Sequence, residues 1–213
     1  MQNNFRSFKM EKAISVKNLS LAYGKKKILE DVTFDIDHGS GVALIGENGS
    51  GKSTLLTTLA GIVRPRSGEF AVNGRIAYLP QEIALIEDLT FNDNLKFFAS
   101  LAGVKVPKEL LFGSDRLRKM RIKKMSGGMK KLCSIVCALL AEADIYMFDE
   151  PCAALDKEHR EMFASYVADL VKSGKTVLYV AHDKAEYEGF YSHELVVEDG
   201  GVRINRAVCE ECK

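Results

Sequence analysis

Residues 46–54 read Gly46-Glu47-Asn48-Gly49-Ser50-Gly51-Lys52-Ser53-Thr54, which matches the phosphate-binding loop pattern G-x-x-x-x-G-K-[ST]. The apolar run Val42-Ala43-Leu44-Ile45 precedes the loop and is typical of a buried parallel strand. After the loop, apolar residues recur at helical spacing: Leu55, Leu56, Leu59 and Ile62. Because the pattern counts only between a strand and a helix, both flanks support a genuine phosphate site.

The chemistry of this loop follows from its glycines and its position. Glycines let successive backbone N–H groups point at one anion, and the start of the following helix adds its positive end. Lys52 can reach the β- and γ-phosphates, and the Ser53 hydroxyl can hold Mg²⁺. We therefore predict that residues 46–54 bind the phosphates of a nucleoside triphosphate.

Length and charge limit the other functions. A chain of 213 residues can bury the core of one domain with a subsidiary lobe. The net charge is +1, so the whole chain offers no electrostatic case for nucleic acid or membrane binding. The longest apolar run, residues 135–141, is far shorter than the roughly 18 residues of a membrane span. Residues 1–12 lack the apolar segment of a secretory signal.

The chain has five cysteines: Cys133, Cys137, Cys152, Cys209 and Cys212. Their odd number favours free thiols in a reducing cytosol. Cys209 and Cys212 form a lone C-x-x-C without a second ligand pair, so incidental cysteines and a metal or redox role both stay open.

Alternating patterns predict an antiparallel β layer around the phosphate loop. Residues 14–21 and 32–36 alternate apolar and polar and are joined across residues 24–27. Residues 69–72 and 76–79 form a further strand pair around an Asn73-Gly74 turn.

Residues 82–144 have a helical pattern. Thr90 with Asp93 predicts the start of one helix, which Gly103 and Pro107 end, and Ser126 caps another. Six basic residues lie between residues 116 and 124. They form either a solvated face or a contact with an acidic partner or anionic lipid.

The pattern then returns to alternating strands and helices. Residues 145–148 and 176–181 predict buried strands on either side of a helix at 158–172. The core face of this helix is predicted to hold Met162, Phe163, Tyr166, Val167 and Leu170. Strands that alternate with helices imply a parallel sheet.

We therefore predict an α/β fold with a P-loop NTPase core, a mixed sheet, an antiparallel β subdomain and an inserted helical subdomain. The chain forms a single domain over 1–213. Its core with the β layer covers 14–81 and 145–204, its helical subdomain covers 82–144, and its tails are 1–12 and 205–213.

Polar residues follow the predicted core strands at the edge where ligands bind in open α/β sheets. Asp149 would hold Mg²⁺ directly or through water, and Glu150 could polarise the attacking water. An ordinary acidic pair at the end of a strand is the alternative for these two. His182 also ends a strand, and a structural role is its alternative. Gln81 follows the strand at 76–79 and Pro80.

A second anion site is predicted where Ser126-Gly127-Gly128 opens a helix, because backbone N–H groups and a hydroxyl meet there.

Taken in order, these motifs resemble those of an ATP-binding-cassette (ABC) transporter nucleotide-binding domain over about residues 14–204. The matching positions are Tyr23 for the adenine-stacking aromatic, residues 46–54 for Walker A, Gln81 for the Q-loop, Met125-Ser126-Gly127-Gly128-Met129 for the signature motif, residues 145–150 for Walker B with the catalytic Glu150, Ala154-Leu155-Asp156 for the D-loop and His182 for the switch histidine.

The resemblance implies an ATPase that uses ATP and Mg²⁺. Two such domains pair head to tail, with ATP between the Walker A motif of one copy and the signature loop of the other. The resemblance also implies that Gln81 lies near Mg²⁺ and the attacking water. It also implies a second copy or a homologous ATPase subunit, a separate transmembrane permease, a place on the cytoplasmic face of the membrane and no nucleic acid. The compact form favours an exporter-type permease.

Two positions depart from the family pattern. Met129 replaces the usual Gln and cannot donate an amide hydrogen bond, and Cys152 replaces Thr or Ser. We still expect an active ATPase, because neither position is a phosphate ligand or the base.

Two other functions compete with transport. A soluble ABC ATPase acting on DNA or the ribosome would need coiled-coil insertions or two tandem cassettes. A small-molecule P-loop kinase would not need the Ser126 loop, Asp156 or His182.

Overall fold

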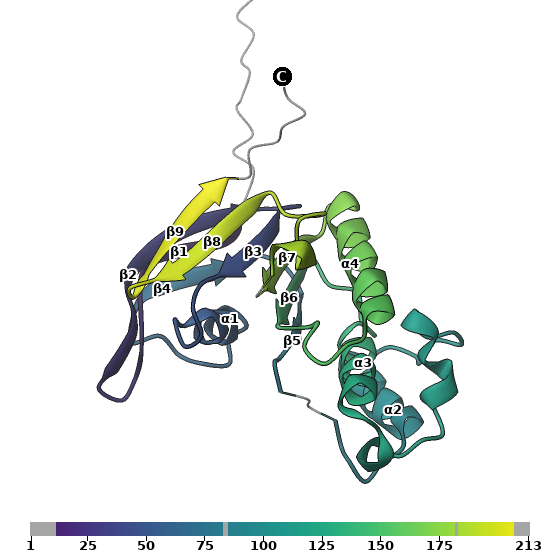
Figure 1. Cartoon of the computed structure of the whole chain (residues 1–213). Helices are drawn as coiled ribbons and strands as arrows, with labels where there is room; N and C mark the ends of the chain where they lie inside the picture. Colours follow the sequence, from purple (N-terminus) through teal and green to yellow (C-terminus); the bar gives the residue numbers. More distant parts are fainter. Residues whose placement is uncertain (1–11, 83–84, 182, 207–213) are drawn as a thin grey trace, which may run out of the picture.

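The computed structural model describes residues 12–82, 85–181 and 183–206, which build two sheets and a set of helices (Figure 1). The larger sheet has the strand order β5-β6-β7-β3-β8-β9. Strands β5 (Ile76–Leu79), β6 (Ile145–Asp149), β7 (Thr176–Val180), β3 (Gly41–Ile45) and β8 (His193–Glu198) run parallel, and β9 (Gly201–Arg206) is antiparallel to β8. The sheet is therefore mixed, as predicted.

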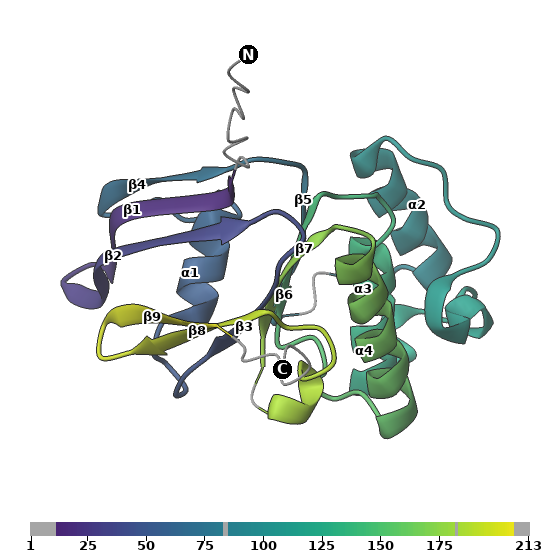
Figure 2. The same cartoon turned by 90° about the horizontal axis from the view of Figure 1, so that it is seen from above.

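The central strands are buried on both faces because each face meets its own core. Successive side chains of a strand point to opposite faces. Ile145 and Met147 accordingly join the core that includes α1 (Lys52–Leu59), whereas Tyr146 and Phe148 join the core of α3 (Gly127–Ala138) and α4 (Lys157–Lys172). Figure 2 shows α1 on one side of these strands and α3 and α4 on the other.

The predicted β layer is a three-stranded sheet with the order β2-β1-β4. Strands β1 (Lys12–Tyr23) and β2 (Lys26–Asp37) pair antiparallel, which confirms the first predicted pair.

The second predicted pair is wrong, although both strands exist. β4 (Ser67–Val72) pairs with β1, whereas β5 pairs in parallel with β6. The Asn73-Gly74 turn passes the chain from one sheet to the other, since Gly74 packs against Asp144 and the Arg75 N–H donates to the Asp144 carboxylate (2.9 Å).

The helical subdomain contains α2 (Phe91–Ala102), the 3-10 helices η1 (Leu111–Leu117) and η2 (Ile122–Lys124), and α3. The predicted caps are confirmed: the Thr90 hydroxyl accepts from the Asp93 N–H (3.2 Å) and the Ser126 hydroxyl accepts from the Met129 N–H (3.3 Å). Gly103 ends α2 in the left-handed region.

Two predictions are wrong, the helical position of Ile62 after the phosphate loop and the place of Met162 on the core face of its helix. Ile62 lies beyond the end of α1 and is 63% exposed, because that helix closes at Ala60 and Gly61 turns the chain at a φ of 78°. Met162 is 41% exposed. The buried side of α4 is centred on Phe163 and Val167, and Met162 lies about 100° around the helix from Phe163.

Candidate active site

The phosphate loop connects β3 to α1, in the strand–loop–helix context that the sequence predicts. Gly46, Gly49 and Gly51 have φ values of 148°, 80° and 112°, in the region that favours glycine. A Cβ on Gly46 would lie 2.2 Å from the Val197 carbonyl oxygen. A Cβ on Gly51 would lie 2.7 Å from the Ile28 side chain, so glycine is required at both positions.

Lys52 lies across this loop. Its buried ammonium donates to the carbonyl oxygens of Gly46 and Glu47, both at 2.8 Å. Burial lowers the pKa of Lys52, and the nearby Glu150 and Asp149 oppose that effect. The positive charge of Lys52 is therefore held beside the backbone N–H groups of the loop. A phosphate chain bound there would contact the ammonium and the N–H groups together.

Ser53 joins the loop to the end of β6, because its hydroxyl donates to the Asp149 Oδ1 atom (3.0 Å). Asp149 is only 2% exposed. Burial is the main cause that raises its pKa and Glu150 adds to it, while Ser53, Lys131 and Lys52 act in the opposite direction. A hydroxyl beside a carboxylate is the kind of hard oxygen pair that Mg²⁺ prefers.

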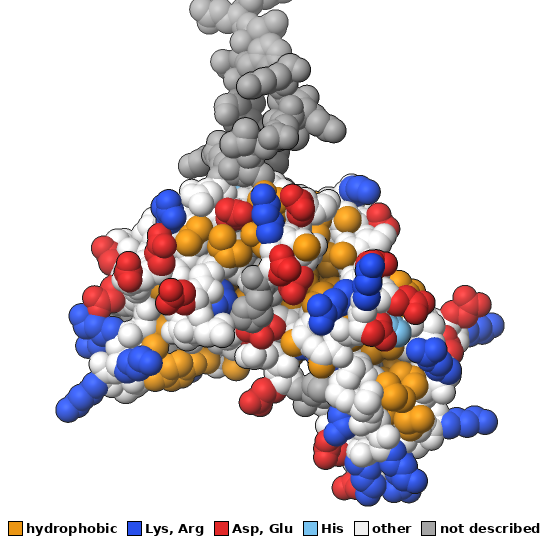
Figure 3. Space-filling view, viewed as in Figure 1, with side chains coloured by type: hydrophobic (Ala, Val, Ile, Leu, Met, Phe, Trp, Pro, Cys, Tyr) orange, Lys and Arg blue, Asp and Glu red, His pale blue; other side chains and the backbone are white. Residues whose placement is uncertain are grey.

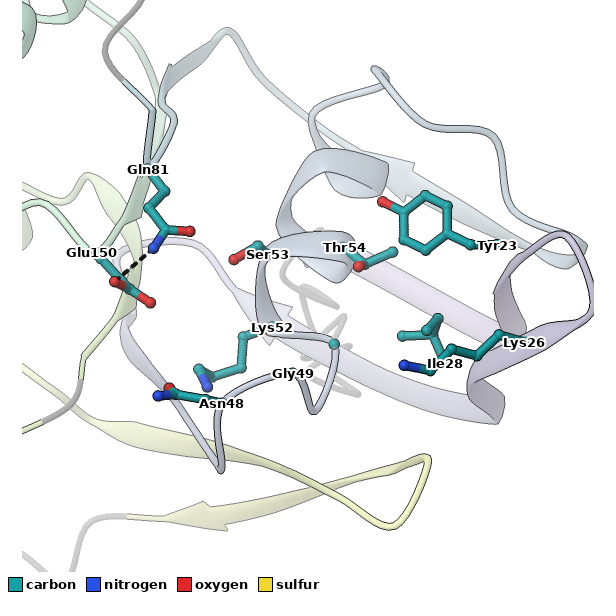
Figure 4. A pocket seen from close by; sticks show the side chains of 11 residues that line it. Tyr23, Lys26, Ile28, Asn48, Gly49, Lys52, Ser53, Thr54, Gln81 and Glu150 are labelled. Carbon is teal, nitrogen blue, oxygen red and sulfur yellow. Dashed lines mark hydrogen bonds between the residues drawn. The ribbon is translucent and has the colours of Figure 1, made fainter.

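Gln81 and Glu150 meet at the same edge of the sheet. The Gln81 Nε2 atom donates to the Glu150 Oε2 atom at 3.0 Å. Glu150 has a φ of 48°, an uncommon conformation for a residue other than glycine and one that clusters at functional sites. Figure 4 shows the Ser53 hydroxyl facing this pair.

These groups surround a cavity of about 470 Å³, within the size range of small-molecule sites. Tyr23 and Glu150 lie at opposite ends of it, with the phosphate loop between them (Figure 4). The cavity is lined by Tyr23, Lys26, Ile28, Asn48, Gly49, Gly51, Lys52, Ser53, Thr54, Gln81 and Glu150.

Sequence reasoning missed Lys26 and Ile28 as lining residues. Lys26 is paired with Tyr23 across the β1–β2 hairpin, and Ile28 packs over Gly51. A signal for Lys26 was available, because the predicted connection at 24–27 directly follows Tyr23.

The remaining residues of the loop face a neighbouring hollow of about 400 Å³. Gly46, Glu47 and Ser50 line it together with Val197 and Asp199. The buried Ser50 hydroxyl has no hydrogen-bond partner among the described residues.

The signature residues lie away from both hollows. Ser126, Gly128 and Asp156 line a separate cavity of about 290 Å³ together with Met129 and His159. A Cβ on Gly128 would lie 2.6 Å from the Ala154 carbonyl oxygen, so the signature loop and the D-loop are packed together. Gly127 is exposed at the start of α3.

Asp156 caps α4 by accepting from the His159 N–H (2.9 Å), and its Oδ1 atom lies 2.7 Å from His159 Nδ1. The hydrogen bond from the His159 N–H is the main cause that lowers the pKa of Asp156.

The cysteines of the described chain are free, as the sequence predicts, and the structure shows them buried. Burial raises the pKa of Cys133 and of Cys137 to about 12. The Tyr179 hydroxyl donates to the Cys152 sulfur at 3.0 Å. Cys209, Cys212 and the predicted switch residue His182 lie outside the described residues.

Two residues of the basic run are bonded within the chain. Arg118 donates to Asp115 (2.8 Å) and to the Pro107 carbonyl oxygen (2.8 Å), and Lys123 donates to Asp88 (2.6 Å). Lys119, Arg121 and Lys124 are exposed. Figure 3 shows basic side chains gathered at the lower end of the helical subdomain with acidic ones beside them.

Across residues 12–82, 85–181 and 183–206, no helix has the length and apolar character that crossing a membrane requires.

Comparison with known proteins identifies this arrangement. A family model described as "ABC transporter" matches residues 29–153. An uncharacterized ABC transporter ATP-binding protein of Methanocaldococcus jannaschii is 32% identical over 199 residues, which cover 90% of this chain and 76% of that protein. The linearmycin resistance ATP-binding protein LnrL of Bacillus subtilis is 31% identical over 207 residues, which cover 88% of this chain and 67% of LnrL.

A solved structure of an ATP-binding subunit of an ABC transporter has a TM-score of 0.82 at 30% identity, covering 91% of this chain and 90% of that one. Other relatives are named for Nod factor export in Paraburkholderia xenovorans and for sulfate/thiosulfate import in Chlorella vulgaris. The family model matches more than half of this chain, and the chain therefore belongs to the ABC transporter family as an ATP-binding subunit.

Proposed function

We propose that this chain hydrolyses ATP to ADP and phosphate and that the reaction drives transport through a separate transmembrane permease. The observation that carries the proposal is the convergence of Lys52, the Ser53–Asp149 pair and the Gln81–Glu150 pair on one edge of the sheet. Phosphoryl transfer to water requires three groups at one site: a positive charge, a pair of oxygen donors and a carboxylate.

In the proposed binding mode, ATP lies along the cavity from Tyr23 to Glu150. The adenine stacks on Tyr23, which is 56% exposed and so free to receive it. The amides of residues 46–54 and the ammonium of Lys52 hold the phosphates. Binding requires Lys52 to exchange its two carbonyl acceptors for phosphate oxygens.

In the proposed reaction, Glu150 accepts a proton from water as the water oxygen bonds to the γ-phosphorus and the bond to the ADP oxygen breaks. Gln81 orients Glu150 through the hydrogen bond already present. Ser53, Asp149 and Gln81 would hold Mg²⁺, and their oxygen atoms fit that ion. When bound, Mg²⁺ would neutralise charge on the β- and γ-phosphates. His182, which lies outside the described residues, is proposed as the switch histidine of this reaction.

We also propose that two copies share each ATP, or that this chain pairs with a homologous subunit. The signature residues Ser126, Gly127 and Gly128 and the D-loop residue Asp156 do not line the cavity of Lys52 in their own chain. In a head-to-tail pair they would complete the site of the partner copy. The exposed start of α3 supplies backbone N–H groups for that contact.

The helical subdomain, residues 82–144, is proposed to contact the permease on the cytoplasmic face of the membrane, while 14–81 and 145–204 form the core. Phe97 and Leu101 on α2 are 45% and 70% exposed and would be covered by such a partner. An exporter-type permease is proposed as the partner, although relatives named for both transport directions match the chain.

The test is to purify the tagged chain from detergent-solubilised membranes and to measure phosphate release from ATP. We expect a multi-span membrane protein to co-purify in stoichiometric amounts and phosphate to be released without an added acceptor. Co-purification with ribosomes or DNA would favour the soluble ATPase alternative, and a requirement for a small molecule that becomes phosphorylated would favour the kinase.

A further inference from the structure

Lys131 is a buried cation that has no role in the reaction proposed above. It lies in the second turn of α3 and is only 3% exposed. Buried lysines are rare unless they are paired. Within the described chain, however, Lys131 makes no ion pair closer than 4.0 Å. Its partners are backbone oxygens instead.

The ammonium of Lys131 donates to the carbonyl oxygens of Gln81 (3.2 Å) and Pro80 (3.4 Å). These two residues follow β5 and begin the segment that leads into the helical subdomain. The side chain of Gln81 in turn donates to Glu150. A continuous set of hydrogen bonds therefore runs from α3 through Gln81 to the proposed base.

The charge of Lys131 also acts on the end of β6. Burial lowers the pKa of Lys131, while Asp149 and Glu150 both act to raise it. The ammonium thus lies in the field of the two carboxylates that frame the reaction, although neither is its direct partner.

Neighbouring contacts fasten the same segment to the helical subdomain. Lys130 pairs with Glu87, and the Asn94 side chain both accepts from the Ile86 N–H (2.8 Å) and donates to its carbonyl oxygen (3.1 Å). Lys131 differs from these contacts, because it holds the backbone of Gln81, whose side chain donates to Glu150.

The first residues of the same helix belong to the signature loop. Ser126 caps α3, and five residues at about 1.5 Å each place Lys131 roughly 7.5 Å along the helix axis from it. The backbone hydrogen bonds of this continuous helix fix the position of Lys131 relative to Ser126. Any shift of the signature loop relative to the sheet therefore moves the ammonium that holds Gln81.

We propose that Lys131 is a positioning residue, which fixes the Gln81 backbone so that its side chain reaches Glu150 and so ties the base to the position of the signature helix. This inference rests on the proposed ATPase function.

The experiment compares Lys131→Met with wild type in the full chain, by phosphate release and by equilibrium binding of a fluorescent ATP analogue. Met keeps the buried stem but removes the donor. We expect kcat to fall about 10- to 100-fold, the range for a catalytic group displaced by about 1 Å, with KM and analogue binding within about threefold of wild type. Lys131→Gln retains a donor and should recover part of the loss. Lys130→Met is the matched control, and its kcat should equal that of wild type.

A double-mutant cycle with Gln81→Ala separates positioning from general support of the fold. If Lys131 acts through Gln81, adding Lys131→Met to Gln81→Ala lowers kcat no further. A wild-type kcat in Lys131→Met, a loss confined to KM, or a fully additive loss in the double variant would overturn the inference. If Lys131→Met does not fold, as thermal unfolding will reveal, the cycle is run with Lys131→Gln. Absence of phosphate release by the wild-type chain would instead refute the proposed function.

Discussion

Replacing Glu150 by Gln changes the proposed base and leaves the rest of the site in place. The amide keeps the shape of the side chain and one oxygen that can accept a hydrogen bond from Gln81. In the present chain that bond joins Gln81 Nε2 to Glu150 Oε2 at 3.0 Å. It cannot take a proton. We expect hydrolysis to fall at least about 10²-fold, the low end for losing a general base, which corresponds to roughly 2.7 kcal/mol of transition-state stabilisation.

ATP affinity should survive in Glu150→Gln, because the loop, Lys52 and the Ser53–Asp149 pair are untouched. Losing a negative charge beside the γ-phosphate should favour the ATP-bound state. The variant should therefore accumulate as an ATP-bound dimer on size exclusion, whereas Lys52→Ala should lose nucleotide and stay monomeric.

The assay measures phosphate release in single-turnover and steady-state conditions, with nucleotide affinity measured on the same samples. Glu158→Gln is the matched control, since that side chain is exposed in the first turn of α4 and should leave kcat unchanged. Wild-type hydrolysis by Glu150→Gln would refute the role of Glu150 as base, and His182 would be the next residue to test.

Three further variants test separate parts of the molecule. Met129→Gln should raise ATP-dependent dimerisation or turnover by no more than about tenfold, roughly 1.4 kcal/mol, through one added hydrogen bond. A fall in activity would show that Met129 is instead a packed part of the interface between the two copies. The double variant Arg121→Glu/Lys124→Glu should weaken assembly with the permease in a pull-down and spare ATP binding. Unchanged assembly would make the exposed basic side chains a solvated face, and Arg118 is left out because its bonds hold the fold. Asp149→Asn should raise the Tm of the nucleotide-free chain at neutral pH, because burial raises the pKa of Asp149 in the folded state and the charged form costs stability. The Tm difference should be lost as the pH falls through that raised pKa toward the unfolded value of about 3.9, and a constant difference in Tm across this range would contradict the reasoning.

The strand–loop–helix unit could be predicted from sequence because its signals are local. Residues 46–54 need glycine at positions that only glycine can occupy, and the flanking strand and helix have distinct periods. The caps at Thr90 and Ser126 are equally local, since each depends on a side chain and an N–H three residues away.

The wrong strand pairing and the overlooked Lys131 concern contacts between residues distant in sequence. An Asn-Gly turn between two strands is a strong hairpin signal, but the partner of β5 is set by burial against β6, some 70 residues later in the chain. Likewise, Lys131 is one of several similar basic residues in sequence. Only the folded chain distinguishes its buried ammonium from the ion-paired Lys130.

The relation between the two cavities also lay beyond the sequence. Motif order indicates which residues belong to the phosphate loop and which to the signature loop, but not whether one chain brings them together. In this fold the Lys52 cavity and the Ser126 cavity are lined by different residues, and no residue lines both. The shared site proposed above follows from that separation.

Complementation between two inactive copies tests this shared site most directly. Lys52→Ala removes the phosphate cradle, and Gly127→Glu places a carboxylate at the exposed start of α3, where a Cβ meets nothing within 4 Å and Ser126 still caps the helix. Each variant alone should be inactive in phosphate release.

In a mixture, a head-to-tail pair of the two variants contains one intact site, formed by the Lys52 of one copy and the signature loop of the other. We predict that mixing the variants restores phosphate release that neither shows alone, with Gly127→Ala as the control that keeps activity by itself. A mixture as inactive as its components would contradict the shared site.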